Sequence, residues 1–199
     1  MSTQHGQFDQ RRFRLEESTH LNGGARTVFI EHMTPGTQVP PHRHHRFSET
    51  FDLISGSMSV YATDEKPDLE ALDASVQELK VGVPVVVPKG NHHMYRVGDE
   101  DTVLRCIVTP GDADFERLLM IMNGLARDGR MEGPEALGSS LLLMAIAFDL
   151  SDAHVIGPVS DMLKGVKAEQ GTAIEELKKS LLASYHNEEG LKDLLRGNA

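Results

Sequence analysis

Cysteine and positive charge are both scarce in this sequence. Cys106 is the only cysteine, so no disulfide can form within one chain and no zinc site can be built from cysteines alone. Lysine and arginine number 20 against 30 aspartates and glutamates, a formal net charge of -10 at pH 7. This charge disfavours binding modes that neutralise phosphates or anionic lipid headgroups. Nucleic acid and membrane surfaces are therefore not expected as partners.

Long apolar runs are absent as well. No stretch reaches the roughly 18 uncharged apolar residues that a membrane-spanning helix needs, and residues 1–17 are polar and charged without the apolar region of a secretory leader. We therefore expect a cytoplasmic protein. The 199 residues, 39% of them hydrophobic, suffice for one buried core with an appendage or for two small units.

The pattern of the chain changes near Pro110. Before it, short runs rich in Val, Ile, Phe and Thr alternate with glycine and proline turns, which is typical of an antiparallel sandwich or barrel. The expected strands are 27–32, 50–54, 58–62, 81–87, 93–97 and 102–108, with the residues from Val83 to Val87 forming a buried strand. The sequence thus predicts an N-terminal arm (1–26), a β-barrel (27–110) and an α-helical C-terminal extension (111–199).

Apolar spacing after Pro110 is helical. Asp112 is the expected N-cap of a first helix, and a second helix is expected after Pro134. The segment Leu141–Phe148 is apolar on all sides, which favours burial against the barrel or against a partner subunit. Thr172 and Glu175 have the spacing of a capping box and predict the start of a third helix.

Histidines cluster in the strand-rich part, where five of the ten are at positions 42, 44, 45, 92 and 93. A first pattern comprises Gly36, five residues, His42-Arg43-His44, four residues, Glu49, six residues and Gly56. Because alternate residues of a strand share a face, His42 and His44 are expected to point into one interior while Arg43 and His45 point away. A turn over the polar residues 45–48 would bring Glu49 to the same point.

A second pattern supplies a further ligand. It comprises Gly82, five residues, Pro88-Lys89-Gly90, two residues and His93. Pro88 ends the pairing of the preceding strand, and Gly90 permits a turn that returns His93 toward the interior. His42, His44, His93 and Glu49 together offer three imidazoles and one carboxylate. This donor set suits one divalent transition metal (Fe, Mn, Ni, Zn, Co or Cu) and leaves coordination positions open.

These two patterns resemble the two sequence motifs of the cupin superfamily at every Gly, His, Glu and Pro. Val97 departs from the family pattern, which has Asn four residues after its second-motif histidine. The resemblance spans Gly36–Val97 and implies a mainly β fold, the cupin (double-stranded β-helix or jelly-roll) barrel. The C-terminal part is loosely similar to the extensions of quercetinase-like single-domain cupins. The family resemblance implies dioxygenases of this ligand type as leading examples of activity.

Two residues are candidates for catalysis. Glu49, as a movable carboxylate, is a candidate general base that accepts a substrate proton. Tyr95 follows His93 by two residues on the same predicted strand, so its side chain is expected to face the barrel interior as well. There its hydroxyl either steers a substrate and donates a proton, or is satisfied by a backbone carbonyl in the core.

Other polar residues near the motifs carry a weaker signal. His45 and His92 adjoin the ligands, but alternation turns them to the opposite face, at the surface or in a position that supports the ligands. Arg105 and Cys106 alternate on the last strand, so only one of the two faces inward. An outward arginine and a buried cysteine that fills space are the commoner arrangement.

The sequence leaves several functions open. The first is a metal-dependent oxidoreductase of dioxygenase type that acts on a small oxygenated organic molecule. The same four ligands also serve isomerases and lyases of this fold. A non-catalytic module that binds or senses a small ligand is the second possibility, and a structural metal in an oligomeric barrel is the third. Leu141–Phe148 and the exposed barrel edges favour a homodimer.

Overall fold

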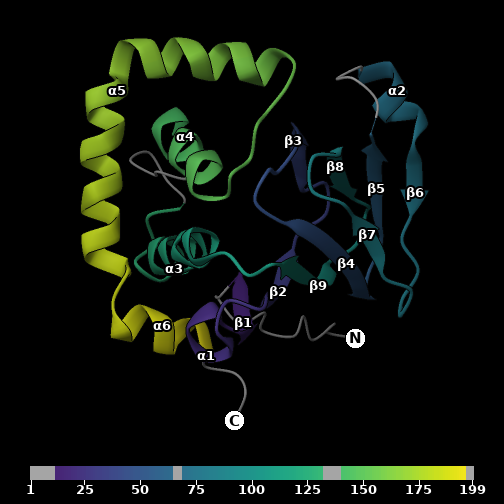
Figure 1. The fold of residues 1–199 in the computed structure, drawn as a ribbon, viewed down its shortest axis with the longest axis horizontal. Coiled ribbons are helices and arrows are strands. Elements are labelled where there is room, and N and C mark those ends of the chain that lie inside the picture. The colour runs from purple at the N-terminus through teal and green to yellow at the C-terminus, as the bar shows by residue number, and fades with distance from the viewer. Residues whose placement is uncertain (1–11, 65–68, 132–139, 196–199) are drawn as a thin grey trace, which may run out of the picture.

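The computed structural model describes residues 12–64, 69–131 and 140–195. It contains two antiparallel sheets, with helices α3 to α6 grouped to one side of them (Figure 1). The strands are β1 (Phe13–Glu17), β2 (Thr27–Met33), β3 (Gln38–His42), β4 (Ser48–Ser55), β5 (Met58–Thr63), β6 (Val76–Glu78), β7 (Val85–Val87), β8 (His92–Val97) and β9 (Thr102–Thr109). The helices are α1 (Thr19–Asn22), α2 (Leu69–Ala74), α3 (Ala113–Arg127), α4 (Leu141–Leu150), α5 (Pro158–Tyr185) and α6 (Glu188–Leu195).

The strand order places the motif-bearing strands near one another. One sheet has the order β1-β2-β9-β4-β7 and the other has the order β3-β8-β5-β6. Inner faces of both sheets contribute to one apolar core, because successive side chains of a strand point to opposite faces. Strand β9 follows this alternation: Leu104, Cys106 and Val108 are buried, whereas Arg105 points outward and pairs with Glu16 and Asp52.

The six predicted strand ranges each contain a strand, and three more strands, β1, β3 and β6, lie outside those ranges. Strand β1 falls within the range predicted as an arm and pairs with β2, so the five-stranded sheet begins before residue 27. Strand β3 contains Pro40 and Pro41, and proline cannot donate to a sheet ladder. Because β3 is the first strand of its sheet, the missing donors are tolerated there.

The prediction of a buried strand from Val83 to Val87 is wrong in part. Strand β7 covers only Val85–Val87, and Val81, Val83 and Val86 are 61%, 54% and 60% exposed. Val87 alone among the residues named is deeply buried. The reason is that β7 is the last strand of its sheet, so its outward side chains have no neighbouring strand on one side.

Helix α3 joins the barrel to the helical part. It begins after Asp112, whose side chain accepts from the backbone N–H of Phe115 at 2.8 Å, as the sequence predicted. Phe115, Leu119 and Met120 pack in the barrel core, whereas Ile121 and Leu125 pack in a second core formed with α4 and α5. One helix therefore belongs to both cores.

The predicted apolar segment Leu141–Phe148 is the greater part of α4. Its residues Leu143, Ala145 and Ile146 are buried against α3 and α5 of the same chain. The segment directly after Pro134, where a helix was expected, lies outside the described residues. Helix α5 bends at Gln170, whose backbone is not helical, and the bend is visible in Figure 1. Among the helices in the described ranges, none is both long and apolar enough to cross a membrane.

A buried carboxylate fixes α3 against the first strands. Glu116 is 1% exposed and accepts three hydrogen bonds of 2.7 Å, from the Ser18 hydroxyl, the Thr19 backbone N–H and the Thr27 hydroxyl. These bonds satisfy a charge that is costly to bury alone. The position of α3 over the barrel therefore depends on this residue.

We expect Glu116→Ala to lower the free energy of unfolding by about 2 to 4 kcal/mol, because three donors lose their acceptor and a cavity remains. Urea denaturation with an unchanged m-value measures this loss. Glu188→Ala, at a side chain that is 82% exposed, is the matched control and is expected to leave the free energy unchanged. Equal stability of the two variants would contradict the anchoring role.

Candidate metal centre

The two sheets and one loop bring four polar side chains together between them. His42 ends β3 and lies opposite His93 of β8 in the sheet register. Glu49 is the second residue of β4 in the facing sheet. His44 comes after β3 has ended, so it reaches the site from a loop, and the expected strand alternation between His42 and His44 is not what aligns them. All four sequence-predicted ligands nevertheless meet, and all four are buried.

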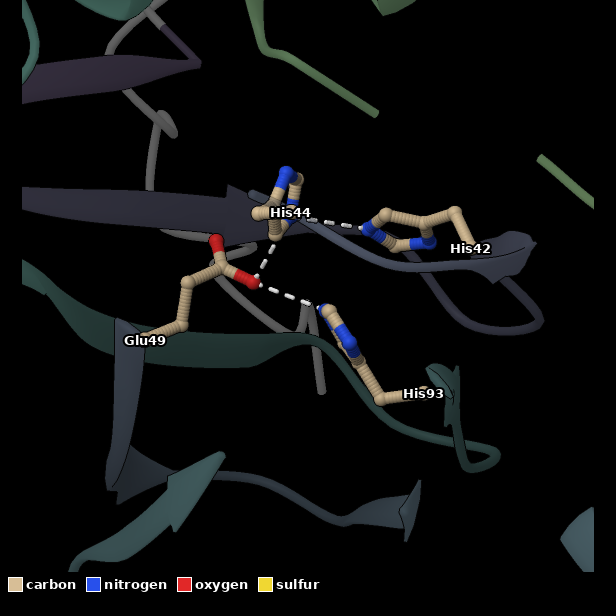
Figure 2. Close-up of side chains that lie close together, drawn as sticks. All are labelled: His42, His44, Glu49 and His93. Carbon is tan, nitrogen blue, oxygen red and sulfur yellow. Dashed lines mark hydrogen bonds and ion pairs between the residues drawn. The ribbon is translucent and has the colours of Figure 1, made fainter. Parts of the chain in front are cut away.

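The ligand atoms point to a common centre (Figure 2). His42 Nε2 lies 3.1 Å from His44 Nε2. Glu49 Oε2 lies 3.1 Å from His44 Nε2 and 2.9 Å from His93 Nε2. Two donors bound at right angles to one ion, each about 2.1 Å from it, are about 3 Å apart. The three distances therefore match the spacing of ligands on a single ion.

Each imidazole has its other nitrogen against a backbone carbonyl. A carbonyl oxygen only accepts, so each Nδ1 carries the proton and each Nε2 presents a lone pair to the centre. The contacts run from His42 Nδ1 to Pro40 O (2.8 Å), from His44 Nδ1 to Asp152 O (3.3 Å) and from His93 Nδ1 to Asn91 O (3.2 Å). Converging lone pairs repel one another unless a cation or a proton lies between them. The donor set thus fits one metal ion.

Charge in the cluster also favours a cation. Burial lowers the pKa of His42 well below its usual value, and the nearby His93 and His44 lower it further. Burial opposes charge on His44, but the Glu49 carboxylate raises its pKa overall. Burial raises the pKa of Glu49, but the neighbouring His44 and His93 side chains outweigh this and hold it well below the usual value. The site is a buried carboxylate that positive charge stabilises.

A turn of the second motif supports the same loop. Gly90 has a φ of 90°, in the region that favours glycine, and its backbone N–H donates to the His44 carbonyl at 2.7 Å. The backbone N–H of Lys89 donates to the Ser48 hydroxyl at 3.0 Å. The Pro88-Lys89-Gly90 turn therefore does what the sequence pattern predicted and also holds the loop that carries His44.

A cavity of about 200 Å³ adjoins the four ligands. Most of its wall is apolar and comes from both sheets and from helices α3 and α4, including Phe29, Phe51, Leu104, Phe115, Leu118 and Phe148. Away from the cluster, polar groups are few: Tyr95, Ser151, the Cys106 thiol, and Arg12 paired with Glu31. Nε and Nη2 of Arg12 both donate to Glu31 Oε1, at 3.0 and 2.7 Å. The ligands thus face a space in which a small molecule fits.

Comparison with known proteins gives matches to solved structures only, since no family model and no curated protein matches. KdgF from Halomonas sp. is 17% identical over 51% of this chain and 80% of that chain, with a TM-score of 0.42. A double-stranded β-helix protein from Klebsiella pneumoniae is 23% identical over 50% of this chain and 76% of its own, with a TM-score of 0.38. A cupin-2 domain protein from Shewanella frigidimarina is 17% identical over 51% of this chain and 84% of its own, also with a TM-score of 0.38.

Such low similarity carries no argument about activity. The strand order and the position of the motif ligands between two antiparallel sheets decide the fold. The barrel has the cupin (double-stranded β-helix) fold that the sequence motifs predicted. The finer likeness to quercetinase-like cupins has no specific support in these comparisons. The helices after Pro110 form the predicted C-terminal extension of the cupin barrel.

Other residues singled out in the sequence have distinct positions in the cupin barrel. Tyr95 is buried and lines the cavity, as its parity predicts. Cys106 also lines it, with Sγ 3.8 Å from Glu49 Oε1, and burial raises the pKa of this thiol well above its usual value. His45 is exposed, as expected, and stacks on His154. His92 is 4% exposed, so a surface position is wrong for it; it lies buried on the strand that carries His93.

Sequence reasoning missed two parts of the site. Arg12, just before β1, and Glu31, on β2, line the cavity. An isolated charged residue in or beside a strand pattern does not indicate in the sequence that its side chain faces a cavity. Asp152 supplies the carbonyl next to His44, and its own φ is 53°. Burial raises the pKa of Asp152, but hydrogen bonds from the His45 and Arg46 backbone lower it below the usual value. No short motif relates residues so far apart in sequence.

Metal analysis of untagged protein tests the site directly. Purified without added metal, the protein is expected to contain about one divalent transition ion per chain. His42→Ala and His93→Ala are each expected to bring the content close to zero, because each removes a buried donor. His186→Ala, at an exposed histidine of the C-terminal part, is the control and is expected to keep the ion. A parent protein that has no metal and cannot be reloaded would refute the metal centre.

Proposed function

We propose that this cupin binds one divalent transition metal through His42, His44, Glu49 and His93 and is a metal-dependent oxidoreductase of dioxygenase type. Its substrate would be a small oxygenated organic molecule. One observation carries the proposal: the four converging donors form part of the wall of a cavity of about 200 Å³. A metal with purely structural duties needs no such space beside it.

A bound ion of this kind supplies Lewis acidity, and redox capacity when it is iron, manganese, cobalt, nickel or copper. The chain itself holds the donors in place through the carbonyl contacts of its histidines. Glu49 is ionised because its pKa is held low, so its carboxylate has the charge state of a proton acceptor. The same low pKa limits its strength as a base. In this proposal Glu49 is first a ligand and second a proton acceptor.

Tyr95 is suited to donate a hydrogen bond to a substrate oxygen. Burial and the nearby Glu31 carboxylate raise the pKa of its phenol well above the usual value, so the proton stays on the oxygen near neutral pH. Arg12 and Glu31 lie at the same cavity and form a pair with no net charge. A group with both donors and acceptors suits hydroxyl and carbonyl oxygens. These residues are proposed to orient the end of the substrate that does not meet the metal.

The walls of the cavity beside the proposed reaction are mostly apolar. Phe51, Phe115 and Phe148 come from a strand, from α3 and from α4, so the helical extension closes the space that the sheets leave open. Apolar surroundings lower the local dielectric constant and strengthen interactions with charge in the cavity. Isomerase and lyase chemistry would use the same surroundings, and so would a binding protein without turnover, which makes the fate of oxygen and substrate the deciding measurement.

Turnover experiments separate these functions. Apoprotein loaded with Fe²⁺, Mn²⁺, Ni²⁺, Co²⁺, Cu²⁺ or Zn²⁺ is incubated with small hydroxylated and carbonyl compounds while dissolved oxygen is recorded. We expect oxygen uptake that depends on substrate and on Fe²⁺. Tyr95→Phe is expected to lower kcat about 100-fold. Tyr61→Phe, at a tyrosine of β5 that is not part of the cavity wall, is the control and is expected to leave kcat unchanged.

Other outcomes of the same experiment identify the alternatives. Substrate conversion under argon at the aerobic rate would replace the oxidoreductase by an isomerase or lyase. Saturable binding with unaltered substrate in both atmospheres would replace it by a binding or sensing module. In either case the metal content of the purified protein is a separate measurement, because it needs no substrate.

We also propose a homodimer, with β7 as its contact strand. Leu141–Phe148 does not offer the dimer contact that its sequence suggested, because α4 is covered largely by its own chain. Exposed apolar side chains lie instead at the end of the five-stranded sheet, namely Ile54, Val81, Val83 and Val86. An edge strand with apolar neighbours pairs readily with a second copy of itself.

Sedimentation equilibrium is expected to give twice the 21.9 kDa mass of one chain. The double variant Val83→Lys with Val86→Lys is expected to raise the dissociation constant tenfold or more, since about 1.4 kcal/mol suffices for that factor. Leu21→Lys, at a side chain that is 74% exposed in α1, is the matched control. A parent protein that sediments as one chain, or a double variant as tight as the parent, would refute this interface.

A further inference from the structure

The segment after α4 returns to the loop that carries His44. The backbone N–H of Arg43 donates to the His154 carbonyl at 3.3 Å, and the N–H of His154 donates back at 2.9 Å. The N–H of Ile156 donates to the Pro41 carbonyl at 3.0 Å. Residues 154–156 thus run beside residues 41–43 and bond to them as a short added strand would. The ligand loop is therefore tied to the helical extension.

Asp152 lies at the centre of this junction. Its Oδ2 accepts from the backbone N–H groups of His45 and Arg46, at 2.6 and 2.7 Å. Its Oδ1 lies 3.0 Å from His154 Nε2, and His154 stacks on His45 with the ring centres 4.2 Å apart. Two backbone donors on one carboxylate make charge-assisted bonds, which are stronger than neutral ones. The side chain of Asp152 clamps the turn between His44 and Glu49.

The backbone of the same residue reaches the metal ligand itself. The Asp152 carbonyl is the acceptor for His44 Nδ1 at 3.3 Å. Asp152 has a φ of 53°, a left-handed conformation that an aspartate tolerates better than most side chains. The strained backbone and the two clamped N–H groups together place the carbonyl against the imidazole.

His44 differs from the other two histidines in this respect. His42 and His93 take their acceptors from Pro40 and Asn91, each two residues earlier in the chain. The acceptor of His44 is 108 residues away. Two ligands are therefore oriented by residues next to them in the chain, whereas the third is oriented by the C-terminal extension.

We propose that Asp152 is a positioning residue of the metal centre, which sets the tautomer and the direction of His44 through its carbonyl and fixes the loop through its carboxylate. The inference rests on the proposed metal centre. It assigns a role to the C-terminal extension beyond covering the barrel. Loss of such a supporting partner typically weakens metal binding by about 10- to 100-fold.

Cobalt binding tests the role without any substrate. Apoprotein is titrated with Co²⁺, and both the dissociation constant and the visible absorption spectrum are recorded, since the spectrum reports the arrangement of the ligands. Asp152→Gly keeps the left-handed backbone available but removes the carboxylate. Asp152→Asn keeps an oxygen acceptor for the two N–H groups. Asp99→Gly, the same substitution in an exposed turn between β8 and β9, is the matched control.

We expect Asp152→Gly to bind Co²⁺ about 10- to 100-fold more weakly with an altered spectrum. Asp152→Asn is expected to restore the spectrum and most of the affinity, and Asp99→Gly to match the parent. Circular dichroism of the apoproteins verifies that each variant is folded. If Asp152→Gly is not folded, the test rests on Asp152→Asn. This variant is expected to show the parent's spectrum, and a different spectrum would contradict the proposal.

Two failures remain distinguishable. A parent protein that binds no Co²⁺ would remove the proposed metal centre altogether. A parent that binds Co²⁺, beside a folded Asp152→Gly variant with the same affinity and the same spectrum, would leave the metal centre intact and overturn only the role of Asp152. Equal losses in Asp152→Gly and Asp99→Gly would overturn it as well, because the effect would then not be local.

Discussion

Three imidazole lone pairs and one carboxylate face each other inside the barrel, and the rest of the structure must make that arrangement tolerable. Buried polar groups are stable only when partners satisfy them. Three backbone carbonyls accept hydrogen bonds from the Nδ1–H groups, so only lone pairs, from the Nε2 atoms and the carboxylate, face the centre. The facing sheets, the turn at Gly90 and the returning C-terminal segment are all needed to supply those carbonyls and to hold the loop. A metal ion would complete the arrangement.

Residue spacing predicted the ligands better than it predicted their geometry. The four ligands meet as expected, because the glycine and proline positions of both motifs specify the turns around them. His42 and His44 do not share a strand face, however, since β3 ends at His42. The strand pattern also overlooked β3, whose prolines argue against a strand unless it lies at an edge. The spacing in the motifs therefore identified the ligand residues, whereas the arrangement of the strands and loops in the fold determines how their side chains meet.

Longer-range features had no local signal at all. Two of the valines expected to be buried before Pro88, Val83 and Val86, are exposed because β7 ends its sheet, a fact of topology that alternation does not reveal. Arg12, Glu31 and Asp152 line or support the site from segments that carry no motif. The helices were easier, since Asp112 and the apolar stripe after it are a local signature. What sequence reasoning missed lies in contacts between distant segments.

The sequence separation of 108 between His44 and its carbonyl acceptor bears on how the protein is made. A chain emerges from the ribosome N-terminus first, and contacts distant in sequence form late. The barrel strands can pair while the extension is still being synthesised, but His44 has no acceptor until Asp152 has left the exit tunnel and α4 has docked. A nascent chain stalled before that point would hold two oriented histidines and one free to rotate. An ion bound by all four ligands would therefore meet the fully oriented set only after Asp152 has been synthesised.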